Sequence, residues 1–174
     1  MIELKDLTEK HVSPFYDWLN DKESIKYSLS AFQKINSPGE VDLWFKSILE
    51  DKKNLNLGIF LKGSNQLIGY AGICSTSNLN KSGEYFIFIG EKTLWGKGIG
   101  SEVTRQIQRI AFFEKGLNRL MLTVSEHNIG GVKAYKKAGF IPEGKLRQAC
   151  FRDGVFHDKI IMSVLKDEYL KLVK

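Results

Sequence analysis

Hydrophobic positions in the first part of the chain repeat with two different periods. Residues 2–7 alternate between apolar and polar, which predicts a short strand. Thr8 is suited to cap a helix that follows this strand. That helix would carry an apolar stripe at helical spacing, made of Val12, Phe15, Tyr16 and Leu19. The next segment, 20–36, has no regular pattern.

Residues 37–40 predict the start of a second helix. Ser37 is a good cap, Pro38 suits the first helical position, and Glu40 completes a capping box. The helix would turn one apolar face to the core, formed by Val41, Trp44, Phe45, Ile48 and Leu49.

The middle of the chain is rich in strand patterns. Residues 55–61 and 66–73 predict two strands joined by a turn at 62–65. Residues 84–89 predict a further strand, with no polar residue after Glu84. Such a run is typical of a central strand that is covered on both faces.

A glycine-rich turn at 96–100 opens the second half of the chain. The helix behind it ends at Gly116, and residues 119–124 predict another strand. Asn128 is placed to cap a later helix that ends at Gly139, and a last strand is expected around 159–165. The helix after the turn has apolar positions three and four residues apart, namely Val103, Ile107, Ile110 and Ala111.

These elements predict one domain over residues 1–174. Strands and helices mix, and residues 84–124 form a strand, a helix and a second strand that suits a parallel pair. We therefore expect an α/β or α+β fold around a single sheet. The composition agrees, since 43% of the residues are hydrophobic and 26% are charged, as in ordinary globular proteins.

Charge and cysteine content narrow the classes of function. The formal net charge of +6 favours an anionic ligand. The lysines and arginines are spread along the chain, so a dedicated nucleic-acid-binding arm is not expected. Cys74 and Cys150 lie far apart, which fits a reducing compartment better than a secreted disulfide scaffold. No run is apolar enough to span a membrane and no signal peptide is visible, so we expect a cytoplasmic protein.

The turn Trp95-Gly96-Lys97-Gly98-Ile99-Gly100 is the strongest chemical signal in the sequence. A glycine-rich turn before a helix can present main-chain N–H groups to a phosphate, and the helix dipole favours the negative charge. The string of nucleotide-hydrolase phosphate loops is absent, and the third glycine of the dinucleotide fingerprint is missing. Taken alone, the turn could also serve only to enter the helix.

The turn occurs together with three other strings. These are Phe86-Ile87-Phe88-Ile89-Gly90, Val124-Ser125-Glu126-His127-Asn128 and Ala134-Tyr135-Lys136-Lys137-Ala138-Gly139-Phe140. In this order the strings resemble the GCN5-related N-acetyltransferase (GNAT) family. Trp95 stands where the family motif has Gln or Arg, as in the ribosomal-protein-alanine acetyltransferase subgroup. Gly131 replaces the alanine of the family's helix signature.

This resemblance implies a GNAT-like domain with a mixed, mostly antiparallel sheet flanked by helices. A parallel strand pair would splay at the cofactor site, where the strand before the turn bulges. The cofactor would be acetyl-CoA, used as a co-substrate without a metal. Its binding residues would be Phe88, Ile89, Trp95, Gly96, Lys97, Gly98, Ile99, Gly100, Ser101 and Asn128.

The resemblance also assigns catalytic roles. Tyr135 would donate a proton to the departing sulfur, although a tyrosine on a helix can equally be a packing residue. Glu84 would accept the proton of the amine, directly or through water. His127 and His157 are weaker candidates for the base. No Cys/His cluster has metal-ligand spacing and no covalent nucleophile is indicated, so direct transfer to the amine is expected.

The acceptor is expected between the early helices and the late strand hairpin. It would be a small-molecule primary amine or a protein N-terminus, and amino-sugar nucleotides and polyamines fit the subgroup. A homodimer is compatible with the family. The alternatives are a non-catalytic acyl-CoA-binding or sensing domain on the same fold and a basic RNA-associated module. The acceptor-binding candidates are Trp18, Tyr27, Glu126 and Phe151, and other aromatic or basic candidates are Phe32, Trp44, Arg147 and Arg152.

Overall fold

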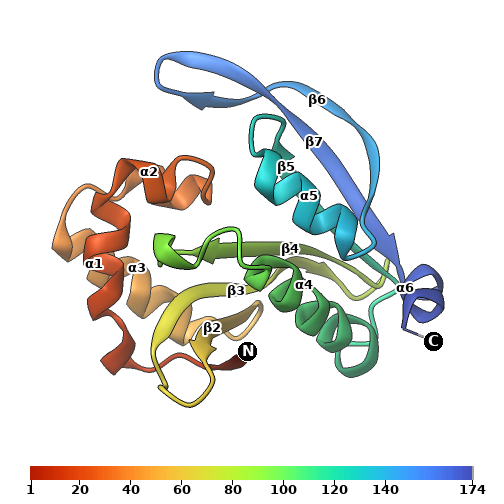
Figure 1. Cartoon of the computed structure of the whole chain (residues 1–174), viewed down its shortest axis with the longest axis horizontal. Helices are drawn as coiled ribbons and strands as arrows, with labels where there is room; N and C mark the ends of the chain where they lie inside the picture. The colour runs from red at the N-terminus through yellow and green to blue at the C-terminus, as the bar shows by residue number, and fades with distance from the viewer. Residues whose placement is uncertain (174) are drawn as a thin grey trace.

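The computed structural model describes residues 1–173, in which a seven-stranded sheet has the order β1-β2-β3-β4-β5-β7-β6 (Figure 1). Only β4 and β5 pair in parallel, and every other neighbouring pair is antiparallel. The α/β fold with a mixed, mostly antiparallel sheet is therefore confirmed. The strands are β1 (Ile2–Asp6), β2 (Leu55–Leu61), β3 (Leu67–Ser77), β4 (Ser82–Ile89), β5 (Arg119–Ser125), β6 (Ile141–Arg152) and β7 (Val155–Leu165).

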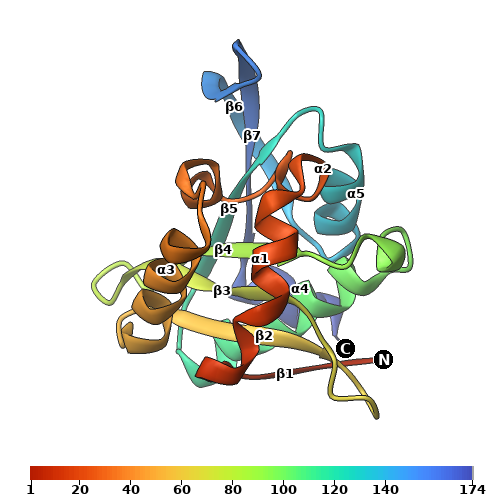
Figure 2. The same cartoon turned by 90° about the vertical axis from the view of Figure 1, so that its left-hand side faces the viewer.

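Helices cover both faces of this sheet (Figures 1 and 2). One face packs against helices of the N-terminal part, and the other packs against helices of the C-terminal half. The first group is α1 (Ser13–Asn20), α2 (Lys22–Ile25) and α3 (Pro38–Glu50), and the second is α4 (Ile99–Arg109), α5 (Ile129–Lys137) and α6 (Lys166–Leu172). Shorter helical turns are η1 (Glu9–His11), η2 (Ser30–Lys34), η3 (Lys92–Leu94) and the π-helical η4 (Ile110–Glu114).

Strand β4 lies at the centre and feeds two separate cores. Tyr85 is buried in the core under α4, with Ile87 packed against that core. Phe88 is buried in the core under α1 and α3, with Phe86 packed against it. Successive side chains of a strand point to opposite faces, so the apolar run serves both cores. The predicted central strand with two covered faces is confirmed.

Three expectations about local structure need correction. The helix expected directly after Thr8 is interrupted, because η1 comes first and α1 begins at Ser13. The irregular segment 20–36 holds α2 and η2. The late strand starts at Val155 and pairs with the long β6, and α6 was not predicted. Residues 141–149 of β6 are all exposed. Because this part of the strand has no buried face, its sequence does not alternate between apolar and polar residues.

The parallel pair opens partway along its length. β4 and β5 are in register only at Ser82–Arg119, Gly83–Leu120 and Glu84–Met121. Beyond this point β4 still pairs with β3 to Ile89, and β5 still pairs with β7 to Ser125. The two strands therefore splay, as expected. The register irregularity falls in β3, between Cys74 and Ser77, and not in the part of β4 next to the glycine turn, where we expected a bulge.

Candidate active site

A cavity of about 670 Å³ lies where β4 and β5 separate. Residues 85–87 of β4 and 122–125 of β5 line it from the sheet, and the loop after α2 and the β6–β7 hairpin close it from above. Its lining comes from both faces of the sheet, since neighbouring residues of one strand contribute. The gap between the strands thus joins the two sides of the sheet.

Main-chain groups of β4 face this gap at every second residue. The Gly90 N–H donates to the Ile68 carbonyl (3.0 Å) on the β3 side. Because antiparallel bonds recur at alternate residues, the main-chain groups of Phe88 also face β3, and those of Ile87 and Ile89 face away from it. The main-chain groups that face the gap are therefore those of Ile87 and Ile89, and those of Phe88 face β3.

Tyr135 reaches the cavity from α5. Its ring packs edge-on against the rings of Tyr85 and Phe140, with centroid distances of 6.1 Å in both cases. Burial raises the pKa of the Tyr135 phenol to about 12. Within residues 1–173 no group hydrogen-bonds its hydroxyl, so a protonated and unpaired phenol faces the cavity at neutral pH. Such a group can act as a proton donor.

Glu84 lines the same cavity from the last paired position of the parallel strands. Its strand neighbours alternate, so Glu84 shares a face with Phe86, and the next residue, Tyr85, points to the side of Tyr135. The carboxylate and the phenol therefore lie on opposite faces of β4. Both line the one cavity because the strands are separated there. This arrangement suits a reaction in which one group removes a proton and the other supplies one.

The glycine turn lies at the N-terminus of α4. Gly96 and Gly98 have φ values of +76° and +81°, which L side chains rarely adopt, and a Cβ at either would meet open space. Ile99 is buried in the core and anchors the first turn of the helix. The main-chain N–H groups at this end are thus open to an anion, as phosphate binding requires. The side chain of Ser101 is directed elsewhere, because its hydroxyl donates to the Ala134 carbonyl (3.4 Å).

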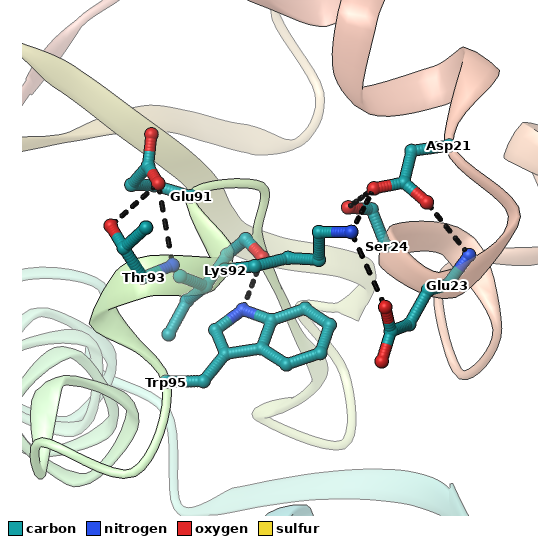
Figure 3. Close-up of polar contacts among 8 residues, drawn as sticks. Asp21, Glu23, Ser24, Glu91, Lys92, Thr93 and Trp95 are labelled. Atoms are coloured by element: carbon teal, nitrogen blue, oxygen red, sulfur yellow. Dashed lines mark hydrogen bonds and ion pairs between the residues drawn. The ribbon is translucent and has the colours of Figure 1, made fainter.

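Trp95 and Lys92 hold the loop that leads into this turn (Figure 3). The indole N–H of Trp95 donates to the Ile89 carbonyl (2.9 Å). Lys92 reaches across to α2, where its Nζ lies 2.5 Å from Asp21 Oδ2 and 3.3 Å from Glu23 Oε2. The turn is thereby tied both to the end of β4 and to the helices on the opposite side of the sheet. This gives Trp95 a structural reason for standing at the head of the motif.

Asn128 caps α5, as predicted, and also lines the cavity. Its Oδ1 accepts from the Gly131 N–H (2.9 Å), while its side-chain amide N–H groups remain available.

Replacing Asn128 with alanine should lower the free energy of unfolding by about 1 kcal/mol, because the cap is lost. Urea denaturation measures this change. Asn128→Ser should restore most of the stability, since serine also caps, and an alanine variant as stable as the wild type would contradict the capping role.

The acceptor candidates fall into two groups. Tyr27 is 42% exposed and lines the cavity, and so does Arg152. Trp18 is only 9% exposed and packs on Phe15 and Phe88 in the core, so it is not a lining residue. Trp18 was a candidate because it is aromatic. The sequence does not show that its position on α1 faces the sheet. Phe32 and Trp44 belong to the same core.

Two other candidates, one on the hairpin and one just after β5, lie away from the cavity. Phe151 is 56% exposed and packs on Phe156, and the next residue, Arg152, points to the cavity instead. Glu126 pairs with Lys145 (2.6 Å) and does not line the cavity. Lys26, Thr123 and Lys159 also line the cavity and were not among the candidates. Residues 155–159, Val-Phe-His-Asp-Lys, do not alternate between apolar and polar, so no local pattern indicated the side to which Lys159 points.

Within residues 1–173, no group of three or more His, Cys, Asp or Glu side chains could hold a metal ion. No helix in this part of the chain is long and apolar enough to cross a membrane.

Known proteins resemble this chain in sequence and in structure. The family model described as an acetyltransferase (GNAT) domain matches residues 2–141. YoaA, an uncharacterized N-acetyltransferase of Bacillus subtilis, is 25% identical over 167 residues, which cover 94% of this chain and 92% of YoaA. YdaF of the same organism, named provisionally as a ribosomal N-acetyltransferase, is 27% identical over 140 residues, 76% of this chain and 75% of YdaF.

A solved structure shares the fold over nearly the whole length. It is the spermidine N-acetyltransferase of Vibrio cholerae in complex with CoA and spermine, with a TM-score of 0.86 and 21% identity. The match covers 97% of this chain and 98% of that one.

Proposed function

Because the chain belongs to the acetyltransferase (GNAT) family, we propose that it transfers the acetyl group of acetyl-CoA to a primary amine, by direct attack of the amine on the thioester. The observation that supports this most is the gap between β4 and β5, which has Glu84 on one side and Tyr135 on the other. A carboxylate and a phenol on the two sides of one opening match the two proton transfers of the reaction.

The residues of the turn 95–101 fit the pyrophosphate of CoA. Gly96 and Gly98 leave the main-chain N–H groups uncovered, and the exposed Lys97 adds a positive charge. Asn128 offers its side-chain amide to the pantetheine part while it caps α5. The V. cholerae enzyme of the same fold was solved in complex with CoA, which supports CoA as the ligand.

The chemical step then follows from the groups around the gap. Glu84 removes a proton from the ammonium group of the acceptor, directly or through water, so that the nitrogen can attack the acetyl carbon. The N–H groups of Ile87 and Ile89 face the gap and would donate to the negative charge that develops on the acetyl oxygen. Tyr135 gives its proton to the sulfur as the carbon–sulfur bond breaks, and the second proton that the nitrogen loses on forming the amide restores the phenol, directly or through water.

An amine panel tests this function. Acetyl-CoA is mixed with the protein and with spermidine, peptides carrying a free N-terminus, or amino sugars and their phosphates. We expect at least one class to yield CoA thiol and acetylated amine in equal amounts, measured by a thiol reagent and by mass spectrometry. If CoA raises the Tm but no amine is acetylated, a non-catalytic acyl-CoA-binding domain is the better description.

Replacing Glu84 with glutamine should lower kcat at neutral pH about 100-fold, the range typical of a lost general base. The deficit should shrink at alkaline pH, because more of the amine is already deprotonated. Steady-state kinetics at both pH values measure the effect. Glu50→Gln, at the exposed end of α3, removes the same charge elsewhere and serves as the control. A neutral-pH kcat that Glu84→Gln leaves unchanged would exclude Glu84 as the base.

A further inference from the structure

One face of the β6–β7 hairpin forms much of the cavity's upper side. Figure 1 shows this hairpin arching towards α2. Its cavity-facing residues, here called the hairpin wall, are Cys150, Arg152, Val155, His157 and Lys159. The wall holds two permanent positive charges, and Asp153, in the exposed turn between the two strands, adds one carboxylate to the cavity lining. Lys26, from the loop on the other side of the cavity, adds a third positive charge.

The opposite face of the same hairpin is electrostatically balanced. There Lys145 pairs with Glu126 (2.6 Å) and with Asp158 (3.6 Å). Within residues 1–173, neither Arg152 nor Lys159 forms an ion pair, although both side chains are partly buried. A partly buried charge without a counter-charge lowers the stability of the fold. Two such charges on the cavity side, Arg152 and Lys159, therefore suggest an anionic partner that the protein itself does not supply.

Arg152 also has unused donors. Its two terminal nitrogens donate to the Phe151 carbonyl (3.2 Å) and to the Ser28 carbonyl (3.3 Å), which fixes the guanidinium between the hairpin and the loop after α2. Its Nε is buried and has no hydrogen-bond partner in the part of the chain that the structure describes. A guanidinium has five N–H donors in a fork that suits carboxylate and phosphate groups. Two hydrogen bonds hold the Arg152 guanidinium in place, but donors remain that an anion could use.

We propose that the acceptor carries an anionic group, a carboxylate or a phosphate, which Arg152 and Lys159 bind while its amine reaches Glu84. This rests on the proposed function, because it names the chemical class of the amine. The cavity carboxylates are Glu84, needed for the amine, and Asp153 in the exposed turn of the hairpin. A polyamine would meet three lysine or arginine side chains there. The acceptor class thus differs from spermine, which the V. cholerae enzyme binds.

Binding of matched amine pairs tests this acceptor class. Calorimetry on the CoA-saturated protein compares glucosamine 6-phosphate with glucosamine, and 4-aminobutyrate with butylamine, with spermidine as a separate ligand. The first pair reports on phosphate and the second on carboxylate. We expect the member with the anionic group in at least one pair to bind about ten-fold or more tightly than its counterpart without that group, as charge-assisted hydrogen bonds do.

Variants assign the preference to the hairpin wall. Arg152→Met should abolish the preference, Lys159→Met should reduce it, and Arg152→Lys should keep part of it. Lys145→Met removes a charge from the opposite face and should leave it unchanged. CoA binding and Tm are measured for each variant. Because Arg152 also holds the Ser28 carbonyl, Lys159→Met provides a test that does not disturb this contact.

Each outcome decides between the two proposals. If the anionic members bind with the expected preference but no amine is acetylated, the anion site stands and the proposed function fails. If amines are acetylated but the members with and without the anionic group bind alike, or spermidine binds best, the anionic acceptor is wrong and the proposed function stands. Absence of binding by every anionic member also overturns the anion site, as does a preference that survives both Arg152→Met and Lys159→Met.

Discussion

Replacing Tyr135 with phenylalanine should lower kcat about ten-fold or more, while binding of acetyl-CoA and stability change little. The ring would keep its edge contacts with Tyr85 and Phe140. The hydroxyl has no hydrogen-bond partner within residues 1–173, so its removal breaks no contact of the folded protein. Only the proton that the phenol supplies to the sulfur is lost. Burial raises the pKa of this phenol to about 12, so it is protonated throughout the neutral range and available as an acid.

Steady-state kinetics with the best acceptor measure this effect. Tyr169→Phe is a matched control, because Tyr169 is a buried tyrosine of α6 that packs on Phe112 and does not line the cavity. We expect Tyr169→Phe to keep kcat and to affect stability alone. A Tyr135→Phe variant with unchanged kcat would remove the phenol from the mechanism and leave it a packing residue.

Replacing Gly98 with valine should weaken acetyl-CoA binding ten-fold or more. Gly98 has a φ of +81° at the start of α4, and a branched side chain there would cover the N–H groups that face the phosphates. The left-handed conformation also costs an L residue roughly 1–2 kcal/mol, so some loss of stability is expected in addition. Calorimetry with CoA measures the binding, and thermal unfolding measures the stability.

Gly63 separates these two effects. It has a φ of +88° in the exposed turn between β2 and β3, and a Cβ there also meets open space. Gly63→Val should therefore show a similar fall in Tm with normal CoA binding. If Gly98→Val folds and binds CoA as the wild type does, the turn is not the pyrophosphate site.

The parts of the fold that depend on short-range signals could be predicted from the sequence. Ser37 accepts from the Glu40 N–H at the start of α3, and Asn128 caps α5, because a cap is a contact between residues three apart. Gly139 has a φ of +92° just after α5, as a helix-ending glycine should. The two cores on either side of β4 could likewise be predicted, because residues 85–89 form an uninterrupted apolar run.

Features that depend on distant parts of the chain could not be predicted in the same way. The splay between β4 and β5 follows from a parallel register that stops at Glu84, and no local pattern encodes it. Trp18 and Phe151 are both aromatic, yet one faces the core and the other the far side of the hairpin. Their aromatic side chains indicated contact with the acceptor. Whether each faces the cavity depends on how α1 and β6 pack against the rest of the fold, which the sequence does not show.

The charges of the cavity show the same limit. The net charge of +6 pointed to an anionic ligand but could not place it. In the structure, Lys145 is neutralised on one face of the hairpin, while Arg152 and Lys159 on the other face form no ion pair with any residue from 1 to 173. Pairing across strands therefore decides which positive charges are available for binding.

A crystal structure of the protein with bound CoA is the most direct test of the site as a whole. We expect the pyrophosphate to contact main-chain N–H groups of residues 96–101, and the sulfur to lie beside Tyr135 in the gap between β4 and β5. CoA bound away from the turn, or with its sulfur outside this gap, would contradict the assignment of the cavity as the acetyl-transfer site.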